Sequence, residues 1–264
     1  MNDGGGSAVV VVGSFNQDLA FETPSFPAPG ETRLGTFRAG PGGKGFNQAV
    51  AAHRREVPTC FGGAVGEDDA AAARRRFTEA EGLSTRLQVV PGAATGAAGI
   101  IVDRSGENLI VVGLGANEAL SPDHVEAQAA VIAGAQVVLT QLECDLGATR
   151  RALEVARRQG VTTVLNPAPI NTALDAGLLE LVDVLVPNES ETSLLTGLPI
   201  RDERDILRAA AALQARGIQT VILTLGERGA LLARYGEVHR SPAFDVTPVD
   251  TTAAGDAFLG GFSV

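Results

Sequence analysis

A stretch near the end of the chain combines small residues with carboxylates, in the order Asp250-Thr-Thr-Ala-Ala-Gly-Asp256, and apolar residues follow it. This pattern predicts a loop that enters a helix. The first N–H groups of a helix lack partners within the helix and its dipole favours negative charge, so a phosphate can bind at Ala253 to Asp256. Asp256 would then take a proton from a hydroxyl that attacks the phosphate. Alternatively, Asp256 only favours the helix N-terminus and Gly255 only forms a turn.

A second candidate is the glycine-rich stretch from Gly40 to Gly45, which contains Lys44. It fits the dinucleotide pattern G-x-G-x-x-G, with Glu67 near the expected separation of about 20 residues. However, no strong buried strand precedes it, and Lys has no role in that pattern. Gly45 stands where a phosphate-binding Walker loop needs Ser or Thr. The alternative is a loop that brings its backbone and the Lys44 ammonium to a polar ligand.

Polar residues also follow several predicted strands, where ligands bind in open α/β sheets. Each of these groups also fits an ordinary turn or a charged first helical turn. Carboxylates near phosphates usually act through Mg²⁺. The groups are Asn16 with Asp18, Glu143, Asn188 to Glu191, and Thr224 to Gly229.

Strands and helices alternate along much of the chain, which predicts a doubly wound, mostly parallel sheet flanked by helices. The β-branched run at 8–13 predicts a strand buried on both faces. Further strands are expected at 59–65, 136–142, 161–165, 182–186 and 220–225, and hairpins within 230–244. Helices are expected at 46–56, 68–81, 121–133, 146–159, 174–181, 189–195 and 202–216.

Short β runs outside this rhythm predict a small separate sheet. Residues 96–103 and 107–112 flank a turn at Arg104-Ser-Gly106, and 32–39 form a further exposed strand. The lid strands are therefore expected within about 14–40 and 95–115, in a single domain of residues 1–264. The exposed face of this sheet would serve as a lid or a dimer surface.

The bulk composition excludes some functions. The net charge of −10 and the pI near 4.8 argue against a nucleic-acid or anionic-membrane binder. Two isolated cysteines suit a reducing compartment, and three scattered histidines lack metal-ligand spacing. The start lacks a signal-peptide pattern and no apolar run approaches about 20 residues, so a cytoplasmic protein is expected.

Taken in order, these motifs resemble the ribokinase (PfkB-like) family of sugar kinases from about Val9 to the end. Residues 42–49, Gly-Gly-Lys-Gly-Phe-Asn-Gln-Ala, resemble its first signature, and 250–256 resemble its second. The segments Gly115-Ala-Asn117, Leu165-Asn-Pro-Ala-Pro169, Pro187-Asn-Glu-x-Glu191 and Thr224-Leu-Gly226 also resemble family segments.

The resemblance implies a role for each matching residue. Asp256 would be the base, and the N–H groups of Ala253, Ala254 and Gly255 an anion hole. A potassium ion would bind at Asp250 and Thr252, and Glu191 would act indirectly on Mg²⁺. The nucleotide would lie along Asn188, Glu191, Thr224, Gly226 and Gly229. The sugar would bind at Asn16, Asp18, Gly42, Gly43, Lys44, Asn47, Glu143 and Asp256.

The resemblance further implies an ATP-dependent kinase that phosphorylates the 5-hydroxyl of D-ribose and dimerises through the lid. Another sugar or a nucleoside is the alternative acceptor, because Phe46 replaces a small residue and would change the pocket floor. The chain ends early in the helix after Asp256, so the family's C-terminal part is expected to be absent. A catalytically silent sugar-binding protein is therefore a second alternative.

Overall fold

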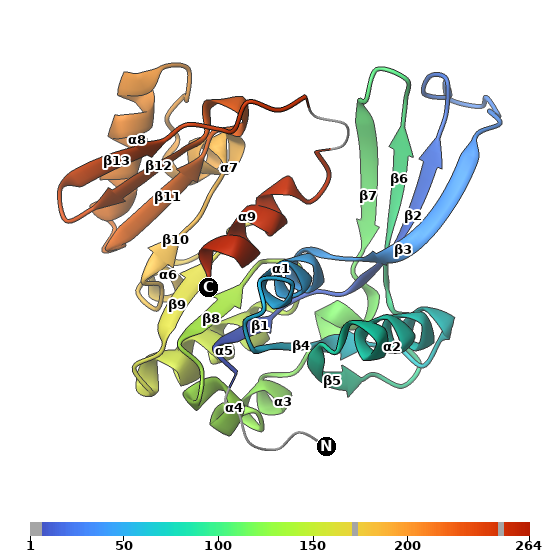
Figure 1. The fold of residues 1–264 in the computed structure, drawn as a ribbon, viewed down its shortest axis with the longest axis horizontal. Helices are drawn as coiled ribbons and strands as arrows, with labels where there is room; N and C mark the ends of the chain where they lie inside the picture. Colours follow the sequence, from blue (N-terminus) through green and yellow to red (C-terminus); the bar gives the residue numbers. More distant parts are fainter. Residues whose placement is uncertain (1–6, 171–173, 248–250) are drawn as a thin grey trace.

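The computed structural model describes residues 7–170, 174–247 and 251–264, and within them the strands form two sheets (Figure 1). The larger, sheet A, has the strand order β13-β12-β11-β10-β9-β8-β1-β4-β5 and is parallel except for β12 and β13. Its strands are β1 Val9–Val12, β4 Thr59–Val65, β5 Ser84–Val89, β8 Val137–Thr140, β9 Thr162–Leu165, β10 Val184–Leu185, β11 Thr220–Thr224, β12 Ala230–Arg234 and β13 Glu237–Ser241.

Alternate residues of β1 pack on opposite faces of sheet A, because successive side chains of a strand point to opposite sides. Val9 and Val11 join one buried cluster, and Val10 and Val12 join another. The helices on the first face are α1 Lys44–His53, α2 Asp69–Glu81 and α9 Ala254–Phe262. Those on the second face are α3 Pro122–Glu126, α4 Ala129–Ala133, α5 Leu146–Arg158, α6 Ala176–Leu179, α7 Glu189–Thr196 and α8 Glu203–Gln214.

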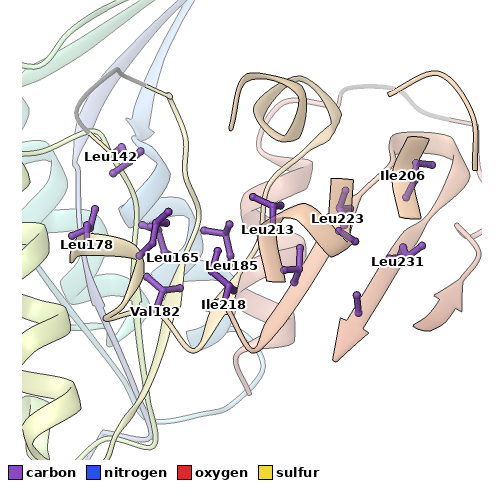
Figure 2. Packing of buried hydrophobic residues seen from close by; sticks show 14 of the residues in the cluster. Leu142, Leu165, Leu178, Val182, Leu185, Ile206, Leu213, Ile218, Leu223 and Leu231 are labelled. Carbon is purple, nitrogen blue, oxygen red and sulfur yellow. The ribbon is translucent and has the colours of Figure 1, made fainter. Parts of the chain in front are cut away.

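The second face contains an aliphatic cluster under α8, shown in Figure 2. Leu165 and Leu185 come from neighbouring parallel strands, and Ile206 and Leu213 come from the inward stripe of α8. This cluster fixes the strands whose carboxyl ends reach the candidate site. The predicted fold class, a doubly wound and mostly parallel sheet with helices on both faces, is confirmed.

The smaller sheet B has the strand order β3-β2-β6-β7 and projects from one end of sheet A (Figure 1). Its strands are β2 Asn16–Glu22, β3 Thr36–Gly42, β6 Gly96–Val102 and β7 Asn108–Gly113. Residues after β1 enter β2 directly, so one continuous segment joins the two sheets. The polar cluster at 16–18 therefore begins a strand, where the sequence allowed a plain turn.

Several element boundaries differ from the predictions. α1 begins at Lys44, two residues before the expected start, because Gly43 adopts φ 92° and serves as its N-cap. The single helix expected at 121–133 is two helices, separated at Ala127 and Gln128. One hairpin, with its turn at Tyr235 and Gly236, stands where several were expected. No helix in the described ranges is long and apolar enough to span a bilayer.

Candidate active site

The polar residues that follow the strands meet at the carboxyl edge of sheet A. β1 leads to Asn16 and Asp18, and β8 leads to Glu143. The N-termini of α1 and α9, which lie side by side in Figure 1, bring Lys44 and Asp256 to the same edge. The edge therefore gathers a cation and three carboxylates from four separate segments.

Asp256 lies in the first turn of α9 and is only 7% exposed. Its Oδ1 accepts a hydrogen bond from Nε2 of Gln48 at 2.9 Å, and its Oδ2 accepts one from Nδ2 of Asn47 at 3.4 Å. Burial raises the pKa of Asp256, and the charge of Glu143 acts in the same direction. The Lys44 ammonium and the two amide donors oppose this increase. An ionised carboxylate with these neighbours can accept a proton from a bound hydroxyl.

Lys44 and Glu143 are held in place by the backbone at Gly43 and by hydrogen bonds between segments far apart in the sequence. A side chain at Gly43 would place its Cβ 2.7 Å from the backbone nitrogen of Asn16, so only glycine fits there. The Lys44 N–H donates to Oε2 of Glu143 at 3.0 Å, and the Ser14 hydroxyl donates to the same oxygen at 2.6 Å. With Oε2 fixed in this way, Glu143 can offer its other oxygen to a ligand.

Asn16 is oriented by a second buried amide. Nδ2 of Asn117 donates to Oδ1 of Asn16 at 3.0 Å, while Asn117 also exchanges two hydrogen bonds with the backbone of Phe15. Since Oδ1 of Asn16 is used as an acceptor, its NH₂ group is the part that can donate to a ligand oxygen.

Asp18 stands on β2 beside the glycine-rich stretch. A Cβ on Gly42 would collide with the Asp18 carboxylate, which explains the glycine at that position. Burial raises the pKa of Asp18 to about 6, and the negative charges of Glu143 and Asp256 contribute to the increase. The side chain is thus an acceptor that ionises fully only above pH 6.

Two adjoining hollows open at this edge. The inner one has a volume of about 200 Å³ and the outer one about 600 Å³. The inner one is lined by Lys44, Asn166, Ala168, Val186, Asn188, Glu191, Thr224, Thr251, Ala253, Ala254, Gly255, Asp256 and Leu259. Both are lined by Asn188, Thr224, Ala254 and Gly255, so they form one path that runs from Asp256 outward.

The predicted nucleotide-side residues line this path. Asn188 caps α7 and forms a capping box with Glu191, whose two oxygens both accept from Asn188. Burial raises the pKa of Glu191. Thr224 pairs with Asn188 through an isolated bridge, and Gly226 and Gly229 follow with positive φ and line the outer hollow.

The N-terminus of α9 is shaped by a strained residue. Ala253 has φ 58°, and the Ala254 N–H donates to the carbonyl of Thr251 at 3.1 Å. Thr252 is exposed in the same loop, and Asp250 lies outside the described residues. Among the residues that the structure describes, no group of three or more His, Cys, Asp or Glu side chains is arranged to hold a metal ion.

Phe46 does not form the floor of the pocket. It is 1% exposed and lies in the core, with ring centroids 5.1 Å from Phe15, 5.4 Å from Phe61 and 5.7 Å from Phe77. Phe46 would therefore act on the sugar pocket only through the packing of these rings, and its effect on the choice of acceptor stays a prediction.

The dinucleotide-binding interpretation is also wrong. Gly40 and Gly42 belong to β3, which pairs antiparallel with β2 in sheet B. A dinucleotide fingerprint instead follows a parallel strand of the main sheet. Lys44 points to the site already described, and Glu67 lies exposed after β4.

Three buried polar residues at the site were not singled out by the sequence interpretation: Ser14, Gln48 and Gln141. Each is 0% exposed. No separate signal marks Gln141 in the sequence, because the predicted strand 136–142 also contains the polar residues Gln136 and Thr140.

Comparisons with known proteins agree with this geometry. The sequence profile of the pfkB family carbohydrate kinases matches residues 7–264. The chain is 40% identical over 256 residues to a ribokinase from Haemophilus influenzae, covering 96% of this chain and 83% of that protein. It is also 40% identical over 259 residues to a deoxyribokinase from Salmonella typhi, covering 97% of this chain and 84% of that protein.

A solved structure extends the agreement to three dimensions. The structure of Arabidopsis thaliana ribokinase complexed with ribose and ATP superimposes with a TM-score of 0.86 at 32% identity. The match covers 98% of this chain and 84% of that one. A crystal structure of Sa239 superimposes with a TM-score of 0.91 at 38% identity, covering 97% of this chain and 85% of that one. The chain belongs to the pfkB family of carbohydrate kinases.

Proposed function

We propose that this protein is an ATP-dependent ribose kinase, which converts D-ribose and ATP to D-ribose 5-phosphate and ADP. The observation that carries the proposal is the position of Asp256. Its carboxylate lies between the polar residues near the start of β2 and the two adjoining hollows along the α9 N-terminus. The ribokinase relatives and the solved complex with ribose and ATP support the same substrates.

The sugar would be held on the side of Asp256 that faces sheet B. Carboxylates and amides suit sugar hydroxyls, since each hydroxyl both donates and accepts. Asp18 and Glu143 would accept from hydroxyls, and Asn16 would donate through its NH₂ group. The remaining sugar-side residues of the proposal are Gly42, Gly43, Lys44 and Asn47.

Phosphoryl transfer would then form one bond to phosphorus and break one. The proton of the 5-hydroxyl passes to Asp256 as O5 bonds to the γ-phosphorus, and the bond from that phosphorus to the β-phosphate oxygen breaks to release ADP. The N–H groups at Ala253, Ala254 and Gly255 would stabilise the transferring phosphoryl. In this step the Ala254 N–H would exchange its bond to the Thr251 carbonyl for one to the phosphoryl.

ATP would occupy the outer hollow along Asn188, Thr224, Gly226 and Gly229. Mg²⁺ accompanies ATP and neutralises phosphate charge. Since both oxygens of Glu191 accept from Asn188, Glu191 would act on the ion through water. A potassium ion held partly by Asp250 and Thr252 would steady the loop that carries the anion hole.

The chain would act as a single domain with sheet B as its lid, and two copies would form a homodimer. Closure of sheet B would exclude water, which otherwise competes as the phosphoryl acceptor. The face of sheet B opposite Asp18 is apolar and exposed, with Phe21 at 42%, Phe37 at 58% and Val111 at 76%. A second copy of the chain would cover that face.

The direct test is ADP release with ATP, Mg²⁺ and K⁺ in the presence of D-ribose, 2-deoxy-D-ribose, other sugars and adenosine. We expect the highest kcat/KM with D-ribose. A higher kcat/KM with 2-deoxy-D-ribose would favour the second candidate, which the equal identity to a deoxyribokinase supports. Ribose binding without ADP release would identify a silent sugar-binding protein. Replacing K⁺ by a larger organic cation should lower kcat if the potassium site is correct.

A further inference from the structure

Three buried amide side chains form a hydrogen-bonded network that ends on Asp256. Nε2 of Gln48 donates to Oδ1 of Asp256 at 2.9 Å and to Oδ1 of Asn166 at 3.3 Å. Nε2 of Gln141 donates to Oε1 of Gln48 through a short hydrogen bond. Gln48 and Gln141 are fully buried, and Asn166 is 7% exposed.

The direction of every hydrogen bond in this amide network is determined. Nδ2 of Asn166 donates to the Val186 carbonyl at 3.0 Å, so its Oδ1 must face Gln48. Gln48 then meets two acceptors, Asn166 and Asp256, and must present its NH₂ group to them. Its Oε1 therefore faces Gln141, which can only donate there. A reversed amide at any point would bring two acceptors together.

The surrounding backbone leaves room for this amide network. A Cβ on Gly13 would overlap Oε1 of Gln141, and a Cβ on Gly45 would lie 2.8 Å from the same atom. A Cβ on Gly260 of α9 would lie 2.6 Å from the carbonyl oxygen of Gln48. The three glycines let β1, α1 and α9 approach closely enough for the amides to reach Asp256.

We propose that Gln48 is a positioning residue which, held by Gln141 and Asn166, fixes the Asp256 carboxylate so that Oδ2 faces the acceptor hydroxyl. Oδ2 is the oxygen on the side of Asn47, whose hydrogen bond to it is longer at 3.4 Å. This inference deepens the proposed kinase function and rests on it.

The hydrogen bond from Gln48 also favours the ionised form of Asp256. The charged groups that act on Asp256 come from several elements: Lys44 of α1 favours ionisation, while Glu143, Asp18 of β2 and Glu191 of α7 oppose it. A neutral donor is therefore needed beside this carboxylate, because a further carboxylate would add to the repulsion.

The test is the pH profile of kcat at saturating ribose and ATP for the wild type, Gln48→Met and Gln48→Glu. Met removes the donor, and Glu replaces it with a negative charge. We expect kcat to fall about 10- to 100-fold, as for a misplaced reacting group. The acidic limb should move to higher pH, further for Glu than for Met, because both changes disfavour ionised Asp256. Ribose Kd should stay within about threefold, since binding groups are unchanged.

Two further variants separate positioning from loss of folding. Gln136→Glu adds the same charge at an exposed site before β8 and should match the wild type. Gln141→Met leaves Gln48 and Asp256 in place and should move the acidic limb in the same direction by less. If Gln48→Met does not fold, Gln48→Glu and Gln141→Met decide the question. Folded variants whose acidic limb stays at the wild-type pH would overturn the proposal.

Failure of the kinase function can be recognised separately, through the titration of Asp256 itself. The ¹³C signal of its carboxyl is assigned by its absence from Asp256→Asn, and needs no turnover. We expect its titration to move to higher pH in Gln48→Glu, and an unchanged titration contradicts the positioning role. If the wild type releases no ADP with any acceptor, the kinase proposal fails whatever this titration shows.

Discussion

At the scale of single residues, the site combines charges that repel one another. Asp18 is repelled by Glu143 and Asp256, while the Lys44 ammonium acts on Asp256 with the opposite sign. Burial disfavours the ionised forms of Asp18 and Asp256 and raises the pKa of both. Asp18 shows this most clearly, since burial raises its pKa from 3.8 to about 6. The site is therefore expected to lower the stability of the fold at neutral pH.

We therefore expect Asp18→Asn to raise the free energy of unfolding at neutral pH. Between pH 3.8 and about 6 the folded state binds more protons at Asp18 than the unfolded state does, so its contribution to the free energy of unfolding falls as pH rises. The Asn variant lacks this titration. It should therefore gain stability relative to the wild type across that window, by about 1 kcal/mol at pH 7 after allowance for solvent screening.

Urea unfolding of both proteins at several pH values from 4 to 7 measures this difference. Ribose affinity should be lost in the variant, because an acceptor for hydroxyls is removed. A stability difference that stays constant with pH would contradict the raised pKa of Asp18.

At the scale of elements, the site depends on how closely α9 packs on α1. Gly260 lies where a Cβ would be 2.5 Å from Cβ of Ala51 and 2.6 Å from the Gln48 carbonyl. This contact sets the distance between Gln48 and Asp256, one on each helix. The N-cap at Gly43 similarly decides that Lys44 begins α1 and donates its N–H to Glu143.

Gly260→Ala and Gly261→Ala form a matched pair that tests the helix contact. At Gly260 the added methyl group would overpack the interface and should destabilise the protein by about 1–3 kcal/mol. At Gly261 a Cβ meets nothing within 4 Å, so the higher helix propensity of Ala should stabilise it by up to about 1 kcal/mol. Thermal unfolding and kcat for both variants measure the effect. Equal behaviour of the two would show that the contact does not set the geometry.

The sequence predicted the α/β fold and most of the residues that line the site, because strand ends and glycine-rich turns leave local signals. Asn16, Asp18 and Glu143 follow strands and do meet Lys44 and Asp256. Features that depend on tertiary contacts were not predictable. Gln48 appeared only within the stretch 42–49, without a role of its own, and the role proposed for it depends on the amides of Asn166 and Gln141 from two other segments. Phe46 suggested a pocket residue, whereas its neighbours in space are aromatic core residues.

At the scale of the whole molecule, sheet B has one face toward the candidate site and an apolar face toward solvent. The alternation of β2 puts Asp18 on one face and Phe21 on the other, and Phe21 pairs with Phe37 on β3. On β7, Val111 is opposite Gly99 and lies on the same face as Phe21. Under the proposed function, one face would bind the sugar and a second copy would cover the other.

Val111→Asp tests the proposed dimer. A charge on the apolar face should weaken self-association, so light scattering should show a monomer where the wild type is a dimer. Asn108→Asp adds the same charge to the same strand on the opposite face and should leave the dimer intact. A wild type that is already monomeric at micromolar concentration would contradict the dimer, as would a Val111→Asp variant that remains dimeric.

The most direct test of the central claim is the rate of ribose-dependent ADP release by Asp256→Asn, with ribose Kd measured on the same sample. We expect turnover to fall by about 10²- to 10⁴-fold, the usual contribution of a positioned base, while ribose still binds. Turnover within a few-fold of the wild type would contradict the role given to Asp256, and with it the proposed mechanism.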